Sequence, residues 1–171
     1  MFLAAGVLVA IAAVLVVASM RPARFQLERS TTVGAHPERV LALLEDLHMW
    51  PSWSAEKEDP TATRTYNEIP KGIGAVCEWD SRGSAGAGRM EIVEASPQGL
   101  LVRVAWKRPF VATNMNAFAL ATRGNATLVT WTLDGEYIFI LKLIALVFGV
   151  DRLMGGHLER GLAALKRVCE R

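Results

Sequence analysis

Residues 100–133 read LLVRVAWKRPFVATNMNAFALATRGNATLVTWTL, and this stretch decides the fold. Within it, residues 100–107, 113–122 and 127–133 alternate between bulky and smaller or polar side chains. A period of two is typical of strands that bury one face. Arg123-Gly124-Asn125, between the last two segments, favours a tight turn. The stretch therefore predicts three consecutive antiparallel strands.

The strand pattern extends toward the N-terminus. Residues 74–80 and 88–95 have similar character and are separated by glycine-, serine- and proline-rich connectors, so five strands in a row predict a meander. Residues 25–33 predict an earlier strand that ends at Thr31-Thr32-Val33, before the break at Gly34-Ala35.

Two amphipathic helices complete the predicted domain. After Pro37, apolar residues at helical spacing predict a helix to about His48, followed by a loop to about Asn67; these residues are Val40, Leu41, Leu43, Leu44 and Leu47. Residues 151–170 predict a long closing helix. The apolar segment 138–150 is shorter than the roughly twenty residues that cross a bilayer, so we expect a helix that lines or covers the core. An alternative places it on a membrane surface.

Residues 2–20 contain no charged side chain, and about twenty helical residues cross a hydrocarbon core about 30 Å thick. We expect an N-terminal transmembrane anchor over residues 1–23. A cleaved signal peptide is the alternative, with Val16-Val17-Ala18 as its cleavage signal, although no basic residue precedes the apolar run.

The arginines near this segment predict its orientation. Arg21, Arg24 and Arg29 all follow the apolar run, so the positive-inside rule places the following domain in the cytoplasm. Signal-peptide cleavage would instead export the domain.

Length and charge exclude several classes of protein. The 171 residues suffice for one domain with a short appendage, which we place at 24–171 and 1–23. With 19 basic and 17 acidic residues, the net charge of +2 gives no electrostatic footprint for nucleic acid. Cys77 and Cys169 have neither the spacing of a zinc site nor that of a disulfide framework, and we expect free thiols.

The order strand, helix, meander, closing helix predicts an α+β domain in which a curved antiparallel sheet wraps around the C-terminal helix. Over residues 25–170 the chain resembles the START-related SRPBCC superfamily, also called polyketide cyclase/dehydrase and lipid transport, or Bet v 1-like. The resemblance lies in Thr31-Thr32-Val33, Ala35-His36-Pro37-Glu38-Arg39-Val40 and Trp50-Pro51-Ser52-Trp53, and then in residues 88–92, 127–131 and 161–166. It implies a helix-grip fold with a cavity for an apolar ligand. Lipid carriers, hormone and polyketide binders and some cyclases share that fold, so activity is not implied.

Side chains on the inward faces of the strands, with two tryptophans of the predicted loop, are the candidate ligand contacts. They are Trp50, Trp53, Trp79, Met90, Trp106, Asn114, Asn116, Phe118 and Trp131. Leu100, Val102, Val104, Leu120, Val129 and Leu133 share these faces. The alternative is that the aromatic residues only fill the core and the two asparagines lie in water near a strand end.

The sequence offers little for catalysis. The histidines are His36, His48 and His157, with no metal-ligand spacing, and Asp46 and His48 are expected to point apart on the first helix. We assign no catalytic residue, metal or cofactor.

Three functions remain open. The favoured one is a membrane-anchored binding or carrier module for a lipid or another apolar small molecule. A cyclase- or dehydratase-type enzyme would need a buried carboxyl group at Glu78, Asp80 or Glu91. A non-catalytic membrane-associated interaction domain would have its cavity filled by its own side chains.

Overall fold

The computed structural model describes residues 24–54, 59, 61–83, 85–137, 142, 149 and 151–171. The predicted N-terminal span and nearly all of the apolar segment 138–150 lie outside these residues. Within the described part of the chain, no helix is long and apolar enough to cross a membrane.

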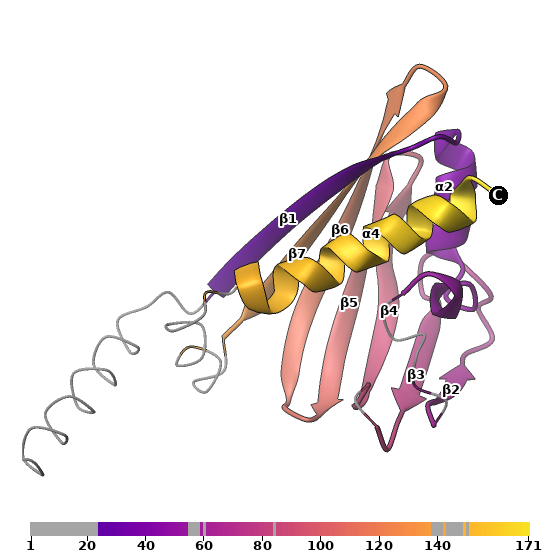
Figure 1. Cartoon of the computed structure of the whole chain (residues 1–171). Helices are drawn as coiled ribbons and strands as arrows, with labels where there is room; N and C mark the ends of the chain where they lie inside the picture. Colours follow the sequence, from indigo (N-terminus) through magenta and orange to yellow (C-terminus); the bar gives the residue numbers. More distant parts are fainter. Residues whose placement is uncertain are drawn as a thin grey trace, which may run out of the picture.

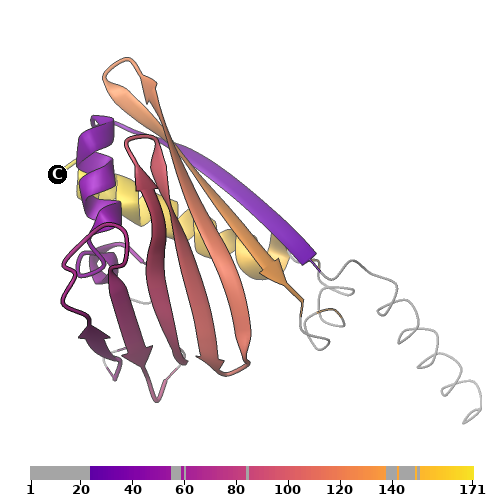
Figure 2. The ribbon, with the colours of Figure 1, turned by 180° about the vertical axis from the view of Figure 1, so that it is seen from behind.

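Seven antiparallel strands form one curved sheet, shown in Figures 1 and 2. Their order across the sheet is β1-β7-β6-β5-β4-β3-β2. The five-strand meander is confirmed, and its strands are β3 (Val76–Asp80), β4 (Ala87–Ser96), β5 (Gly99–Arg108), β6 (Ala112–Arg123) and β7 (Ala126–Glu136). The predicted first strand, β1 (Arg24–Val33), pairs with β7, so the first and last strands of the domain lie side by side.

The predicted loop to Asn67 is wrong in one part, because β2 (Thr63–Tyr66) pairs with β3 at the edge of the sheet. Its sequence, TRTY, has exposed and half-buried positions but no apolar alternation. Backbone pairing to β3 therefore makes this strand, and a hydrophobic pattern could not indicate it.

The first helix, α2 (Pro37–Glu45), is shorter than predicted. Val40 and Leu44 are buried as expected, but the backbone of Asp46 is extended and its Oδ1 accepts a hydrogen bond from His48 N at 2.9 Å. A short 3₁₀ turn, Trp50–Ser52, follows and places Trp50 and Trp53 in the core.

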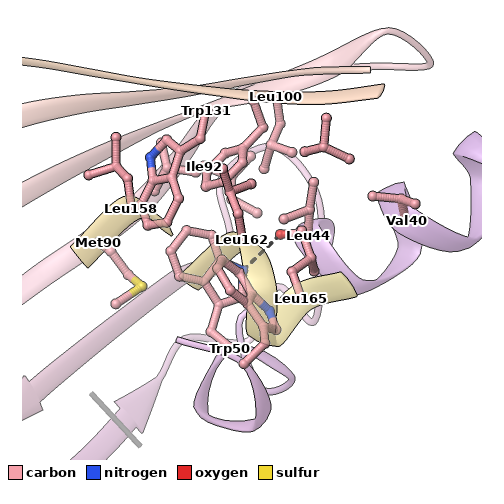
Figure 3. Close-up of a cluster of buried hydrophobic side chains, with 14 of the residues drawn as sticks. Val40, Leu44, Trp50, Met90, Ile92, Leu100, Trp131, Leu158, Leu162 and Leu165 are labelled. Atoms are coloured by element: carbon pink, nitrogen blue, oxygen red, sulfur yellow. Dashed lines mark hydrogen bonds between the residues drawn. The ribbon is translucent and has the colours of Figure 1, made fainter. Parts of the chain in front are cut away.

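The closing helix, α4 (Gly156–Cys169), follows a π-helical turn at Asp151–Gly155 and crosses one face of the sheet (Figure 1). Leu158, Leu162 and Leu165 are buried against the sheet, and Figure 3 shows them beside the side chains of Trp131 and Leu44. Burying each such side chain contributes about 1.5–3 kcal/mol. The sheet and α4 thus form a helix-grip arrangement, as the sequence predicts.

Polar contacts hold α4 along β1, the edge strand. Arg29 on β1 bonds to Glu159 at 2.8 Å and also to Asp151. Near the other end of the helix, Gly34 N donates to Glu170 Oε1 at 2.7 Å. These contacts lie at both ends of the helix and fix its direction across the sheet.

We predict that Gly161→Ala lowers the free energy of unfolding by about 1–3 kcal/mol, the usual cost of overpacking a core. A Cβ at Gly161 would lie 2.6 Å from Cζ3 of Trp131, so the ring or the helix must move. This cost exceeds the gain of roughly 1 kcal/mol that alanine brings to a helix. Urea unfolding measures the change.

Gly156→Ala is the matched control in the same helix. A Cβ there would meet only the flexible tip of Arg160, at 3.2 Å, so stability should be unchanged or higher. Equal stabilities of the two variants would contradict the close contact at Gly161.

Candidate ligand-binding cavity

A cavity of about 330 Å³ lies between the sheet, the Trp50–Ser52 turn and the start of α4. This volume is within the range of about 300–1,000 Å³ that is usual for small-molecule sites. Seven of the nine predicted residues line it: Trp50, Trp53, Met90, Trp106, Asn114, Asn116 and Trp131. Strand periodicity and the tryptophan-bearing turn therefore predict residues that line one cavity, while their contact with a ligand stays a prediction.

The other two predicted residues, Phe118 and Trp79, lie behind the cavity wall. Phe118 stacks on Trp131, with ring centroids 5.0 Å apart, and meets Trp50 edge-on. Trp79 meets Trp106 edge-on at 5.1 Å. The two rings support lining residues, because aromatic pairs of this geometry hold each other in place.

Several lining residues were not proposed as ligand contacts. Val104 and Leu133 were predicted only to face the helix, and Phe25 lies on β1 close to Gly135. Met154 and His157 come from the beginning of the closing helical segment. For the helix residues the sequence held no signal, because helical spacing shows the buried face but not which turns border an empty space.

The mouth of the cavity lies at the β5–β6 turn and the end of β7. Phe110, in that turn, lines the cavity and is 48% exposed, which places it at the boundary with solvent. Glu136, also exposed, lines the same end and pairs with Arg24 at 3.3 Å. A ligand could therefore enter beside the first described residue of the chain.

Hydrogen bonds orient the polar groups of the wall. Trp131 Nε1 donates to Asn116 Oδ1 at 2.9 Å, and both residues are buried. With its amide oriented to satisfy its neighbours, Asn114 accepts a hydrogen bond from Trp106 Nε1 at 3.3 Å and donates one to Thr113 O at 3.1 Å. The two asparagines thus lie within the cavity wall rather than in open water.

The family model described as polyketide cyclase / dehydrase and lipid transport matches residues 24–170. The chain belongs to this family. The matched region coincides with the described domain, from the start of β1 to the end of α4. A search of the curated proteins gave no match.

Solved structures share the fold at low sequence identity. Protein CV1439 from Chromobacterium violaceum has a TM-score of 0.59 at 14% identity, covering 88% of this chain and 99% of its own. TTHA0849 from Thermus thermophilus has a TM-score of 0.61 at 22% identity, with coverages of 85% and 97%. The di-domain ARO/CYC StfQ from the steffimycin biosynthetic pathway has a TM-score of 0.65 at 11% identity, with coverages of 86% and 51%.

The three carboxylates that we considered for an enzyme of this family, Glu78, Asp80 and Glu91, do not line the cavity. Glu78 and Asp80 are exposed, and they pair with Lys107 at 3.2 Å and Arg108 at 2.5 Å, respectively. Glu91 is half-buried and pairs with Arg89 at 2.6 Å. Each carboxylate forms an ion pair with a basic side chain, so these groups contribute to the surface of the sheet and not to the cavity.

The expectation that Asp46 and His48 point apart is wrong. His48 Nδ1 lies 3.1 Å from Asp46 Oδ1, because α2 ends at Glu45 and helical spacing no longer applies. The imidazole also stacks on Tyr66, with ring centroids 3.8 Å apart. Neither member of the pair lines the cavity.

His157 is the one imidazole among the described lining residues. It is half-buried, and its ring centroid lies 5.8 Å from that of Trp131. Burial lowers the pKa of His157, and the nearby charge of Arg160 lowers it further. The imidazole is therefore neutral at neutral pH.

This pKa direction predicts an acid-side loss of stability. Because His157 binds a proton more readily in the unfolded state than in its half-buried position in the folded state, the free energy of unfolding falls as the pH drops below about 6.5. His157→Asn should reduce this loss between about pH 7.5 and pH 5. Urea unfolding at each pH gives the comparison.

His36→Asn serves as the control, since His36 is exposed and its side chain caps no helical N–H. It should leave the pH dependence close to that of the wild type. If both variants behave alike, burial of His157 does not cause the loss.

Proposed function

We propose that the domain is a binding or carrier module for a lipid or another apolar small molecule, tethered to a membrane by its N-terminal segment. The observation that carries this proposal is the tryptophan-walled cavity of about 330 Å³ in a domain of the polyketide cyclase/dehydrase and lipid-transport family. Apolar walls with a few placed polar groups are the usual composition of a small-molecule site.

The cavity chemistry favours binding over catalysis. Of the described lining residues, Glu136 is the one carboxylate, and it lies exposed at the mouth with Arg24 as its partner. Within the described residues, no group of three or more His, Cys, Asp or Glu side chains could hold a metal ion. A binding role requires none of these groups.

A cyclase- or dehydratase-type enzyme is the second candidate. The fold likeness to the ARO/CYC protein StfQ and the neutral imidazole of His157 in the cavity support it. A neutral imidazole can accept a proton from a bound substrate. The carboxylates first considered for this role lie elsewhere, so His157 would be the proton acceptor.

An interaction domain without a ligand is supported less well. That function would leave the space between sheet and helix filled by the protein's own side chains, whereas a cavity of small-molecule size is present. Phe110 and Val111, which are 48% and 81% exposed, form an apolar tip. Because Phe110 also lines the cavity, this tip forms part of the rim of the cavity mouth and does not require a protein partner to explain it.

The amino-acid sequence supports the membrane tether. The uncharged residues 2–20 precede Arg24, the first residue of β1, which lies at the mouth of the cavity. An anchor ending there would hold the mouth close to the bilayer, where apolar molecules are concentrated. The arginines after the apolar run support a cytoplasmic domain.

Filling the cavity should abolish ligand binding. Ala112→Trp inserts an indole into the cavity wall on β6, and we expect at least a tenfold loss of any ligand that copurifies with the wild-type protein. Native mass spectrometry followed by organic extraction measures the ligand. Ala121→Trp adds the same side chain at an exposed position of β6 and should retain it.

The outcomes separate the candidate functions. A wild-type domain that binds no molecule from a lipid extract, or equal ligand content in both variants, would contradict the cavity as the binding site. Turnover of a bound molecule that disappears in His157→Asn would favour the enzyme.

Charges placed in the N-terminal segment should release the protein from membranes. Val9→Arg with Val14→Arg puts two cations into the predicted span, at a cost of about 2.5–3.5 kcal/mol each near the centre of the bilayer. Fractionation should move the variant to the supernatant, and Thr31→Arg, a change within β1, should not.

Orientation has its own test. A reporter enzyme that is active only outside the cytoplasm, fused after Arg171, should be inactive. High reporter activity would support export instead, and a wild-type protein found entirely in the soluble fraction would refute the anchor.

A further inference from the structure

Trp53 differs from the other four tryptophans in its hydrogen bonding. Trp50 donates to Leu44 O, Trp79 to Ala85 O and Trp131 to Asn116 Oδ1, each at 2.9 Å, while Trp106 reaches Asn114. Among the described residues, Trp53 Nε1 is the one buried side-chain nitrogen or oxygen without a partner. Buried donors are nearly always paired, so this indole nitrogen is an exception, but it is sealed within the core and does not face the open space of the cavity.

Asn116, unlike Trp53, presents its free donor to the cavity. Its Oδ1 accepts the hydrogen bond from Trp131 Nε1, and its Nδ2, which is not sealed as Trp53 Nε1 is, has no hydrogen-bond partner in the described part of the chain. The residue is only 7% exposed and lines the cavity. Trp131, which orients this amide, also meets the ring of Trp53 edge-on, with ring centroids 6.2 Å apart.

Charge limits what such donors can receive. None of the described lining residues is Lys or Arg, and the carboxylate at the mouth is negative. An anionic headgroup carried inward would lose its hydration without gaining an ion pair, which is unfavourable. A simple cation would have no lone pair to offer Asn116 Nδ2. This donor therefore matches a neutral acceptor.

The size and the walls of the cavity limit the shape of the ligand. The volume of about 330 Å³ is near the lower end of small-molecule sites, and a two-chain phospholipid is several times larger. Indole rings line several sides, and flat rings pack against them in offset or edge-on arrangements.

We infer that the cavity selects a neutral, ring-bearing molecule with a carbonyl, ether or hydroxyl oxygen at its buried end, which accepts a hydrogen bond from Asn116 Nδ2. The inference rests on the proposed binding function and specifies its ligand class.

Three probes of nearly equal shape test this selection. They are 2-acetylnaphthalene, which offers a carbonyl oxygen; 2-isopropenylnaphthalene, in which a methylene replaces that oxygen; and 2-naphthoate, which is an anion. We would titrate each by calorimetry into the full-length protein in lipid nanodiscs and subtract titrations into empty nanodiscs. The ketone should bind about three- to tenfold more tightly than the alkene, the range of one hydrogen bond, and the anion should bind most weakly.

Asn116→Asp tests the donor directly. It keeps an oxygen for Trp131 Nε1 and removes the amide N–H groups, so the preference for the ketone should disappear while the alkene still binds. Asn125→Asp, the same change at an exposed position of the β6–β7 turn outside the cavity lining, is the matched control. That variant should keep the preference.

The results distinguish this inference from the proposed function. Equal binding of ketone and alkene by the wild type, or tightest binding of naphthoate, would overturn the ligand class and leave an apolar binding site standing. Binding of none of the three probes would overturn the proposed function as well. If Asn116→Asp does not fold, the wild-type comparison still decides.

Discussion

The contact of Gly161 with Trp131 is the constraint on which the rest of the domain depends. Because a Cβ at this position would lie 2.6 Å from the indole, α4 approaches the sheet as closely as only glycine allows. The ring below the helix stacks on Phe118 and donates to Asn116. One close approach therefore sets the height of the helix, the packing of the aromatic cluster and the orientation of a cavity amide.

The position of the cavity follows from the same geometry. Toward its C-terminal end α4 closes on the sheet through Leu162 and Leu165, which are buried. Toward its N-terminal end, Met154 and His157 border the cavity instead. On β7, Gly135 leaves room for the side chains of Phe25 and Asn114, which line the cavity and would lie within 2.7 Å of a Cβ at that position. The mouth therefore lies where β1 begins and β7 ends.

Strand periodicity in the sequence was enough to find most of the wall. Trp106, Asn116 and Trp131 alternate with outward-facing residues, and a period of two assigns them to one face whatever the curvature of the sheet. The same pattern could not separate them from Phe118, because cavity wall and solid core differ only in the local distance between sheet and helix. Periodicity also could not predict that His157 lines the cavity, because the position of this residue depends on how α4 crosses the sheet. The short strand β2 was missed because pairing at an edge needs no apolar residue.

The pairing of Trp131 with Asn116 also constrains how the site can recognise a molecule. An amide has both an acceptor and donors, so fixing its oxygen on the indole N–H orients its nitrogen without using it. A serine hydroxyl could rotate between partners, whereas this amide is held before any ligand arrives, and preorganisation lowers the entropic cost of binding. Recognition by a neutral hydrogen bond within apolar walls gives selectivity without the tight binding of a buried ion pair. The carrier role that we propose requires that balance.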